Sequence, residues 1–183
     1  CNDENLWQAI AAKMGIETFR EGTQSYRELV NEWCGVLRSQ HSHLLALNSA
    51  LHMASYDRLK WLVDNGTSTW WFQRGEKRYM IKWAARSADI RIVKLVYELA
   101  KRHGDIFRTE LRPREVEYLE SNMDSGMYIA LKNAREDKEG AAAVLEFFLE
   151  KGSTIKIYRA LYEAYIEDDL LTIQYADERN LVT

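Results

Sequence analysis

Aromatic and basic side chains are interspersed along one short stretch of this sequence, and these residue types are the ones best suited to binding. Tryptophan, tyrosine and arginine dominate the energetics of protein interfaces, because they bury large areas while losing few rotatable bonds. The stretch therefore indicates a binding face rather than a reactive centre. Its members are Trp70, Trp71, Phe72, Arg74, Lys77, Arg78, Tyr79, Lys82, Trp83 and Arg86.

Histidine and cysteine side chains near residue 40 could be imagined as zinc ligands. His41 and His43 lie two residues apart, with Cys34 and His52 nearby. This spacing fits no established zinc pattern. We expect a solvated loop at the two histidines, and Cys34 as a small buried apolar residue.

Acidic side chains gather near the C-terminal end, where paired carboxylates or a cation site could be considered. No glycine-bearing loop and no fixed ligand spacing accompanies them. We expect a solvated helix terminus instead, since acids stabilise the first turn of a helix beginning near Asp168. No metal and no cofactor is predicted. The acids are Glu167, Asp168, Asp169, Asp177 and Glu178.

Charge is distributed unevenly along the 183 residues. The net charge is −3, yet residues 74–102 hold nine Lys or Arg against three acids, or +6, which leaves −9 elsewhere. The overall acidity argues against general nucleic-acid binding. Single-stranded nucleic acid stays an alternative partner, because aromatic rings can stack on bases while Lys and Arg follow the phosphates.

Composition favours a helical protein in a reducing compartment. One proline and nine glycines are too few for the frequent turns of a β-sandwich. Two cysteines cannot form a disulfide framework, so an intracellular, cytoplasmic location is expected. No apolar run approaches the roughly 20 residues of a membrane span.

The elements that position the aromatic and basic residues are two helices and a turn. A first helix is expected over 80–87, followed by a second whose apolar residues recur at helical spacing from Ile92 to Ala100. Asp89 can cap the second helix, because a short polar side chain accepts hydrogen bonds from the first free N–H groups. Gly104 is expected to end it.

This unit resembles an ankyrin repeat, T-P-L-H-x-A-A-x-x-G-H-x-x-V-V-x-L-L-L-x-x-G. Similar units begin at Asn48 and recur near residues 127–152 and 157–178, so about four imperfect copies cover 48–183, with an insertion at 105–126. Two alanines allow adjacent hairpins to stack closely. In the unit around residue 84 the matches are Ala84, Ala85, Ala88, Ile92, Val93, Leu95, Val96 and Tyr97.

The resemblance implies an all-α, helical-hairpin repeat solenoid. Residues 1–47 are expected to form an N-terminal helical hairpin or cap. One helix is expected at 3–14 and stops at Gly15, and a second runs from about Tyr26 to Leu37 after a capping box of Ser25 with Glu28. One short β-hairpin is expected where Arg74–Lys77 form a turn between Trp71, Gln73 and Arg78, Met80, with Gly75 at positive φ.

Ankyrin-like arrays bind proteins through hairpin tips and exposed positions of the first helices. The resemblance therefore implies an adaptor or host-directed effector that recognises an acidic protein surface, with no enzymatic activity. A further alternative is a non-catalytic remnant of an ovarian-tumour-type cysteine protease, whose opening resembles NDENLWQAIAAKMG but has Asn5 at the nucleophile position. The predicted binding residues are Met53, Trp70, Phe72, Arg74, Lys77, Arg78, Trp83, Arg86 and Tyr162.

Overall fold

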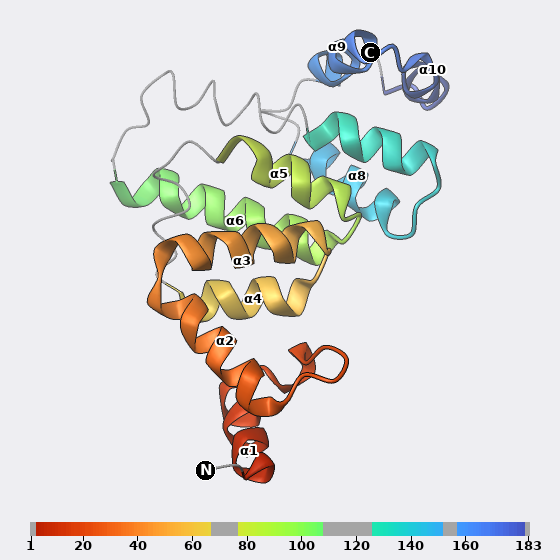
Figure 1. The fold of residues 1–183 in the computed structure, drawn as a ribbon. Coiled ribbons are helices and arrows are strands. Elements are labelled where there is room, and N and C mark those ends of the chain that lie inside the picture. The colour runs from red at the N-terminus through yellow and green to blue at the C-terminus, as the bar shows by residue number, and fades with distance from the viewer. Residues whose placement is uncertain (1–2, 67–76, 108–125, 152–156, 182–183) are drawn as a thin grey trace.

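The computed structural model describes residues 3–66, 77–107, 126–151 and 157–181, and for residues 40–41, 77–79 and 100–107 it describes the backbone alone. Within these ranges all regular structure is helical, so the all-α prediction is confirmed. The helices pair into hairpins that stack from the N-terminal end at the bottom of Figure 1 to the C-terminal end at the top. No helix of the described ranges is long and apolar enough to cross a membrane.

The N-terminal helices form where their capping residues predict. Asp3 caps α1 (Glu4–Met14) and Gly15, at φ 70°, ends it. A short 3₁₀ turn, η1 (Glu17–Phe19), follows. Ser25 and Glu28 form the expected capping box of α2 (Tyr26–Arg38), which buries Leu29, Val30 and Trp33. Leu37, near the end of α2, is 40% exposed.

Four further hairpins follow in the part of the chain that the structure describes. Neighbouring hairpins contact each other through α3 and α5, through α4 and α6, and through α6 and α8. The pairs are α3 (Gln40–His52) with α4 (Tyr56–Asn65), α5 (Lys77–Arg86) with α6 (Ile90–Phe107), helical residues 126–135 with α8 (Ala141–Glu150), and α9 (Ile157–Ile166) with α10 (Leu170–Glu178).

The turn inside each of these hairpins contains a residue in the left-handed region that is not glycine. We call it the turn residue; it is Ala54 (φ 51°), Ala88 (φ 55°), Asp137 (φ 51°) and Asp168 (φ 56°) in the four hairpins. A non-glycine residue adopts this conformation at a cost, so its recurrence between every pair of helices indicates one shared turn geometry.

Backbone hydrogen bonds show that three of these turns are built in the same way. The N–H of the residue after the turn residue donates to the carbonyl five positions back, from Ser55 to Ala50 at 2.9 Å and from Asp169 to Ala164 at 2.8 Å. Lys138 donates to Asn133 in the same manner at 3.1 Å. This bond is the mark of a Schellman motif, which satisfies carbonyls that the end of the first helix leaves free.

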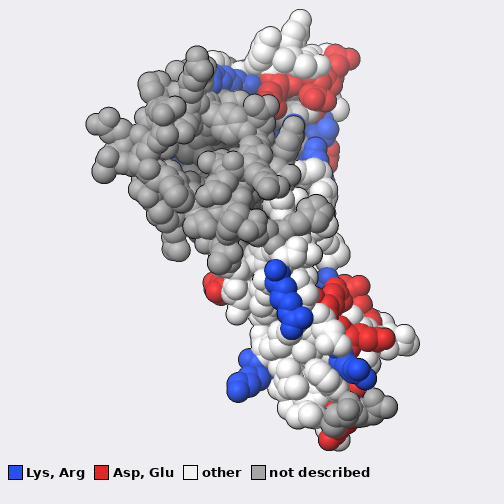
Figure 2. Space-filling model, turned by 60° about the vertical axis from the view of Figure 1, so that its left-hand side comes forward, with Lys and Arg blue, Asp and Glu red and all other residues white. Residues whose placement is uncertain are grey.

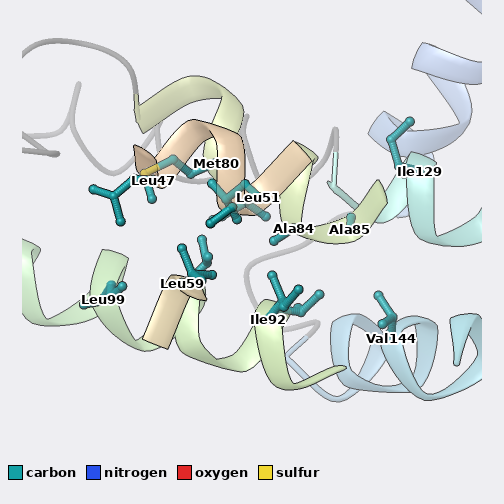
Figure 3. Packing of buried hydrophobic residues seen from close by; sticks show 14 of the residues in the cluster. Leu47, Leu51, Leu59, Met80, Ala84, Ala85, Ile92, Leu99, Ile129 and Val144 are labelled. Carbon is teal, nitrogen blue, oxygen red and sulfur yellow. The ribbon is translucent and has the colours of Figure 1, made fainter. Parts of the chain in front are cut away.

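The core runs through all the hairpins as one cluster. The position four residues before the turn residue is small and buried in three hairpins, as Ala50, Ala84 and Ala164, and is the buried Asn133 in the other. Small side chains there let neighbouring helices approach closely. Figure 3 shows Leu51 beside Ala84, and Ile92 below them, at the contact between the first two of these hairpins.

The structure corrects the prediction of a β-hairpin. Arg78 and Met80 belong to α5, so the second strand of the expected β-hairpin is not formed, while its first strand lies outside the described residues. Helical spacing decides this, because Met80, Ile81, Ala84 and Ala85 are all buried on one side of α5.

The helix that was expected to end at Gly104 continues to Phe107. A single glycine inside a helix costs only about 1 kcal/mol relative to alanine, so it need not end the helix.

His41 and His43 lie in the first turns of α3 rather than in the expected solvated loop. The Ser39 hydroxyl accepts a hydrogen bond from the N–H of Ser42 at 3.3 Å and thereby starts α3 ahead of both histidines.

Candidate interaction face

Trp83 is the centre of an aromatic and basic cluster that joins two hairpins. Its ring lies 3.8 Å, centroid to centroid, from the ring of His52 at the end of α3. The Arg86 guanidinium lies 4.5 Å from the Trp83 ring centroid, within the range of a cation–π contact. Trp83 is half-buried, and His52 and Arg86 are exposed. The cluster therefore presents a preformed aromatic and cationic surface to solvent.

Met53 extends this surface on the α3 side. It caps the C-terminal end of α3 beside His52, and its side chain is 51% exposed. We call the four residues Met53, His52, Trp83 and Arg86 the Trp83 face. The described contact of the His52 ring is with the Trp83 ring.

Basic residues recur along the helix that carries Trp83. Arg78, Lys82 and Arg86 follow each other at intervals of four in α5, so the helical register aligns them along one side. This alignment depends on residues 77–86 being helical. In the expected β-hairpin the three basic residues would not share this helical register. We call these three positions of α5 the basic row.

The predicted binding residues divide into four groups. Trp83 and Arg86 are in contact, and Met53 follows His52, whose ring contacts Trp83; Tyr162 lies on α9 at the other end of the stack, where it is 63% exposed (Figure 1). Lys77 and Arg78 lie in α5, and the structure describes only their backbone. The remaining predicted residues, Trp70, Phe72 and Arg74, lie outside the described residues.

A buried histidine was missed by the sequence analysis. His43 is only 8% exposed, and burial lowers the pKa of its imidazole below the ordinary 6.5. Its Nε2 is buried and has no hydrogen-bond partner among the described residues. The ring lies against Gly66 so closely that a Cβ at Gly66 would overlap it. Within the described ranges no cluster of three or more metal-binding side chains occurs.

A polar network around Asp169 was also missed. Its carboxylate accepts hydrogen bonds from the Thr172 N–H at 3.2 Å and the Thr172 hydroxyl at 2.9 Å, and so caps α10. Arg135 Nη1 approaches Asp169 Oδ1 at 3.0 Å from the preceding hairpin. Burial alone would raise the pKa of Asp169, but the Thr172 hydrogen bonds and the charges of Arg135 and Lys132 lower it.

Tyr128 completes this network on the side of helical residues 126–135. Its hydroxyl donates to Asp169 Oδ2 at 3.3 Å. Burial, together with the charge of Asp169, raises the pKa of Tyr128 to about 12. Each polar group of the network is engaged by another, so we assign the network to joining two hairpins rather than to chemistry.

Asn5, the residue at the nucleophile position of the protease-like opening, lies in the first turn of α1. Its N–H donates to Asp3 Oδ1 at 3.1 Å as part of the α1 cap. The same turn supplies Glu4, whose Oε1 accepts the Tyr26 N–H at 2.7 Å. The Glu4 contact joins α1 to α2, the Asn5 contact belongs to the α1 cap, and an amphipathic helix accounts for the residues involved.

Comparison with known proteins does not place the chain in a family. No protein-family model matches it, and no curated protein or solved structure is similar to it.

Proposed function

We propose that the chain is a protein-interaction scaffold of ankyrin-like helical hairpins that binds an acidic partner surface through the Trp83 face. The recurring turn residue and the recurring small buried position before it support the repeat assignment. Each hairpin is one unit that buries its apolar side against the next, and such stacks offer an extended row of exposed positions for binding.

The observation that carries the proposal is the contact of His52 and Arg86 with Trp83. A tryptophan ring held by its neighbours loses little conformational entropy when a partner covers it. Arginine beside tryptophan is the pairing enriched where interfaces gain most of their energy. Since Arg86 lies over the ring and Lys82 precedes Trp83 on α5, the ring is accompanied by positive charge, and an acidic surface is the matching partner.

The test is a pull-down from cell lysate with the full chain as bait, after nuclease treatment, at low and high salt. The variant Lys82→Glu/Arg86→Glu reverses two charges on α5 and removes no buried residue. Lys94→Glu is the matched control, because Lys94 is exposed on α6. Proteins that are captured by the wild type and by Lys94→Glu, but lost with Lys82→Glu/Arg86→Glu, support the proposal.

A parallel pull-down is run without nuclease treatment. Recovery of nucleic acid alone in that experiment, and only at low salt, contradicts the proposal. In that case the basic row follows phosphates, and binding weakens steeply as salt rises. Equal capture of the same proteins by wild type and Lys82→Glu/Arg86→Glu contradicts the assignment of the Trp83 face.

A further inference from the structure

The C-terminal hairpin exposes a large aromatic side chain at a position that the α3–α4 and α5–α6 hairpins bury. The residue three positions before the turn residue is Leu51 in the hairpin of α3 and α4, where it is 3% exposed. In the hairpin of α5 and α6 it is Ala85, which is 0% exposed. In the last hairpin it is Tyr165, which is 69% exposed. The position three residues before the turn residue is therefore part of the core in those two hairpins and part of the surface in the last one.

The buried members of this position are covered by the next hairpin. Leu51 on α3 lies beside Ala84 on α5 (Figure 3). The carbonyl of Ala85 accepts a hydrogen bond from Asn133 Nδ2, at 2.9 Å, from the hairpin that follows. Tyr165 occupies the position that receives a covering helix elsewhere in the stack, and it is open to solvent.

Tyrosines extend this open position along α9. Ala160 and Ala164 are fully buried on one side of the helix, and Tyr158, Tyr162 and Tyr165 recur every three or four residues on the opposite side. We call Tyr162, Tyr165, Ile166, Leu170 and Leu171 the C-terminal face; each is more than half exposed. A group of exposed apolar side chains of this kind, on the two helices of one hairpin, marks an interaction surface.

Acidic residues are frequent in the hairpin that carries the C-terminal face, and they restrict what can cover it. Residues 157–181 contain six Asp or Glu and two Arg, a net charge of −4. Figure 2 shows acidic and uncharged side chains next to one another at the upper end of the molecule, where α9 and α10 lie. An acidic border favours a partner with positive charge beside its apolar contacts and disfavours an acidic one.

We propose that the C-terminal face binds an amphipathic helix of a partner protein, with an apolar stripe against Tyr162 and Tyr165 and lysines or arginines beside the stripe. A helix is the occupant because the equivalent position in the first two hairpins of the stack is covered by one, and apolar residues at helical spacing fit a row of tyrosines. This face is on a different hairpin from the Trp83 face and has the opposite charge, so it does not depend on the function proposed above.

The test uses two synthetic peptides of about 18 residues with the same leucine and phenylalanine stripe, one with lysines beside the stripe and the other with glutamates. Binding of each fluorescent peptide to the full chain is measured by anisotropy. We expect micromolar binding of the lysine peptide, at least tenfold weaker binding of the glutamate peptide, and a further weakening of the lysine peptide with salt.

The variant Tyr162→Ser/Tyr165→Ser should weaken binding of the lysine peptide at least tenfold. It alters exposed side chains, and unchanged circular dichroism and unfolding midpoint will show that the fold is kept. Leu45→Ser is the control, since Leu45 is 55% exposed on α3 and away from α9. Arg86→Glu separates this face from the Trp83 face and should not reduce binding of the lysine peptide.

Three results would overturn the proposal. The first is equal binding of the lysine peptide to wild type and Tyr162→Ser/Tyr165→Ser. The second is binding of the glutamate peptide as tight as that of the lysine peptide, which would remove the role of the acidic border. The third is a wild-type dimer in sedimentation that Tyr162→Ser/Tyr165→Ser converts to a monomer, because the occupant would then be a second copy.

Discussion

Arg135 and Asp169, 34 residues apart in the sequence, meet at 3.0 Å where two helical hairpins join. The Asp169 carboxylate also caps α10 through Thr172. One side chain therefore both starts a helix and ties its hairpin to the preceding one.

Replacing Asp169 with alanine should lower the free energy of unfolding by about 2 kcal/mol. Loss of the cap accounts for about 1 kcal/mol, and leaving the partly buried Arg135 without this partner accounts for a similar amount. Urea denaturation followed by circular dichroism measures the change. Asp177→Ala, at an exposed position of α10, should change stability by no more than about 0.5 kcal/mol. Equal effects of the two substitutions would show that the network contributes nothing.

His43 should make the protein less stable as the pH falls from 7 to 5. Because burial lowers its pKa below 6.5, the unfolded chain binds a proton more readily than the folded one. Its contribution is present above pH 6.5 and is lost on acidification, at no more than about 1.4 kcal/mol per pH unit for one proton.

Urea denaturation of wild type and His43→Leu at several pH values measures this effect. The variant cannot titrate at this position, so its curve should fall less between pH 7 and 5. Parallel curves for the two proteins would mean that His43 has the same pKa in the folded and unfolded states.

Glycine at the first turn residue should stabilise the protein. Ala54 is exposed and has φ 51°, a conformation that glycine adopts without the strain of a Cβ. We expect Ala54→Gly to raise the free energy of unfolding by about 0.5–1 kcal/mol. Ala143→Gly, at an exposed position inside α8, should lower it by about 1 kcal/mol. Destabilisation by both substitutions would contradict the shared turn geometry.

Local features of the fold could be predicted from the sequence because short-range hydrogen bonds decide them. The caps at Asp3 and Ser25 and the stop at Gly15 each involve residues no more than four positions apart. The β-hairpin prediction was wrong at Arg78 and Met80 because alternation over a few residues also fits a helix, and burial of Met80 with Ala84 decides for the helix.

The candidate site was predicted only in part, because its contacts cross between hairpins. Trp83 and Arg86 were identified from residue type, and Met53 from its place in the repeat. Nothing in the sequence pattern indicates that His52 would contact Trp83, 31 residues away, or that Asp169 would meet Arg135. Such pairs depend on how hairpins stack, and a pattern within one helix does not contain that information.

Photo-crosslinking from the Trp83 face tests the central claim most directly. A photoreactive phenylalanine replaces Met53 in the full chain, and the control carries it at Leu6, which is similarly exposed on α1. We expect a protein adduct from position 53 in cell lysate that disappears when Lys82→Glu/Arg86→Glu is added. Adducts from position 6 alone, or an adduct at position 53 that survives the charge reversal, would contradict binding of an acidic partner at the Trp83 face.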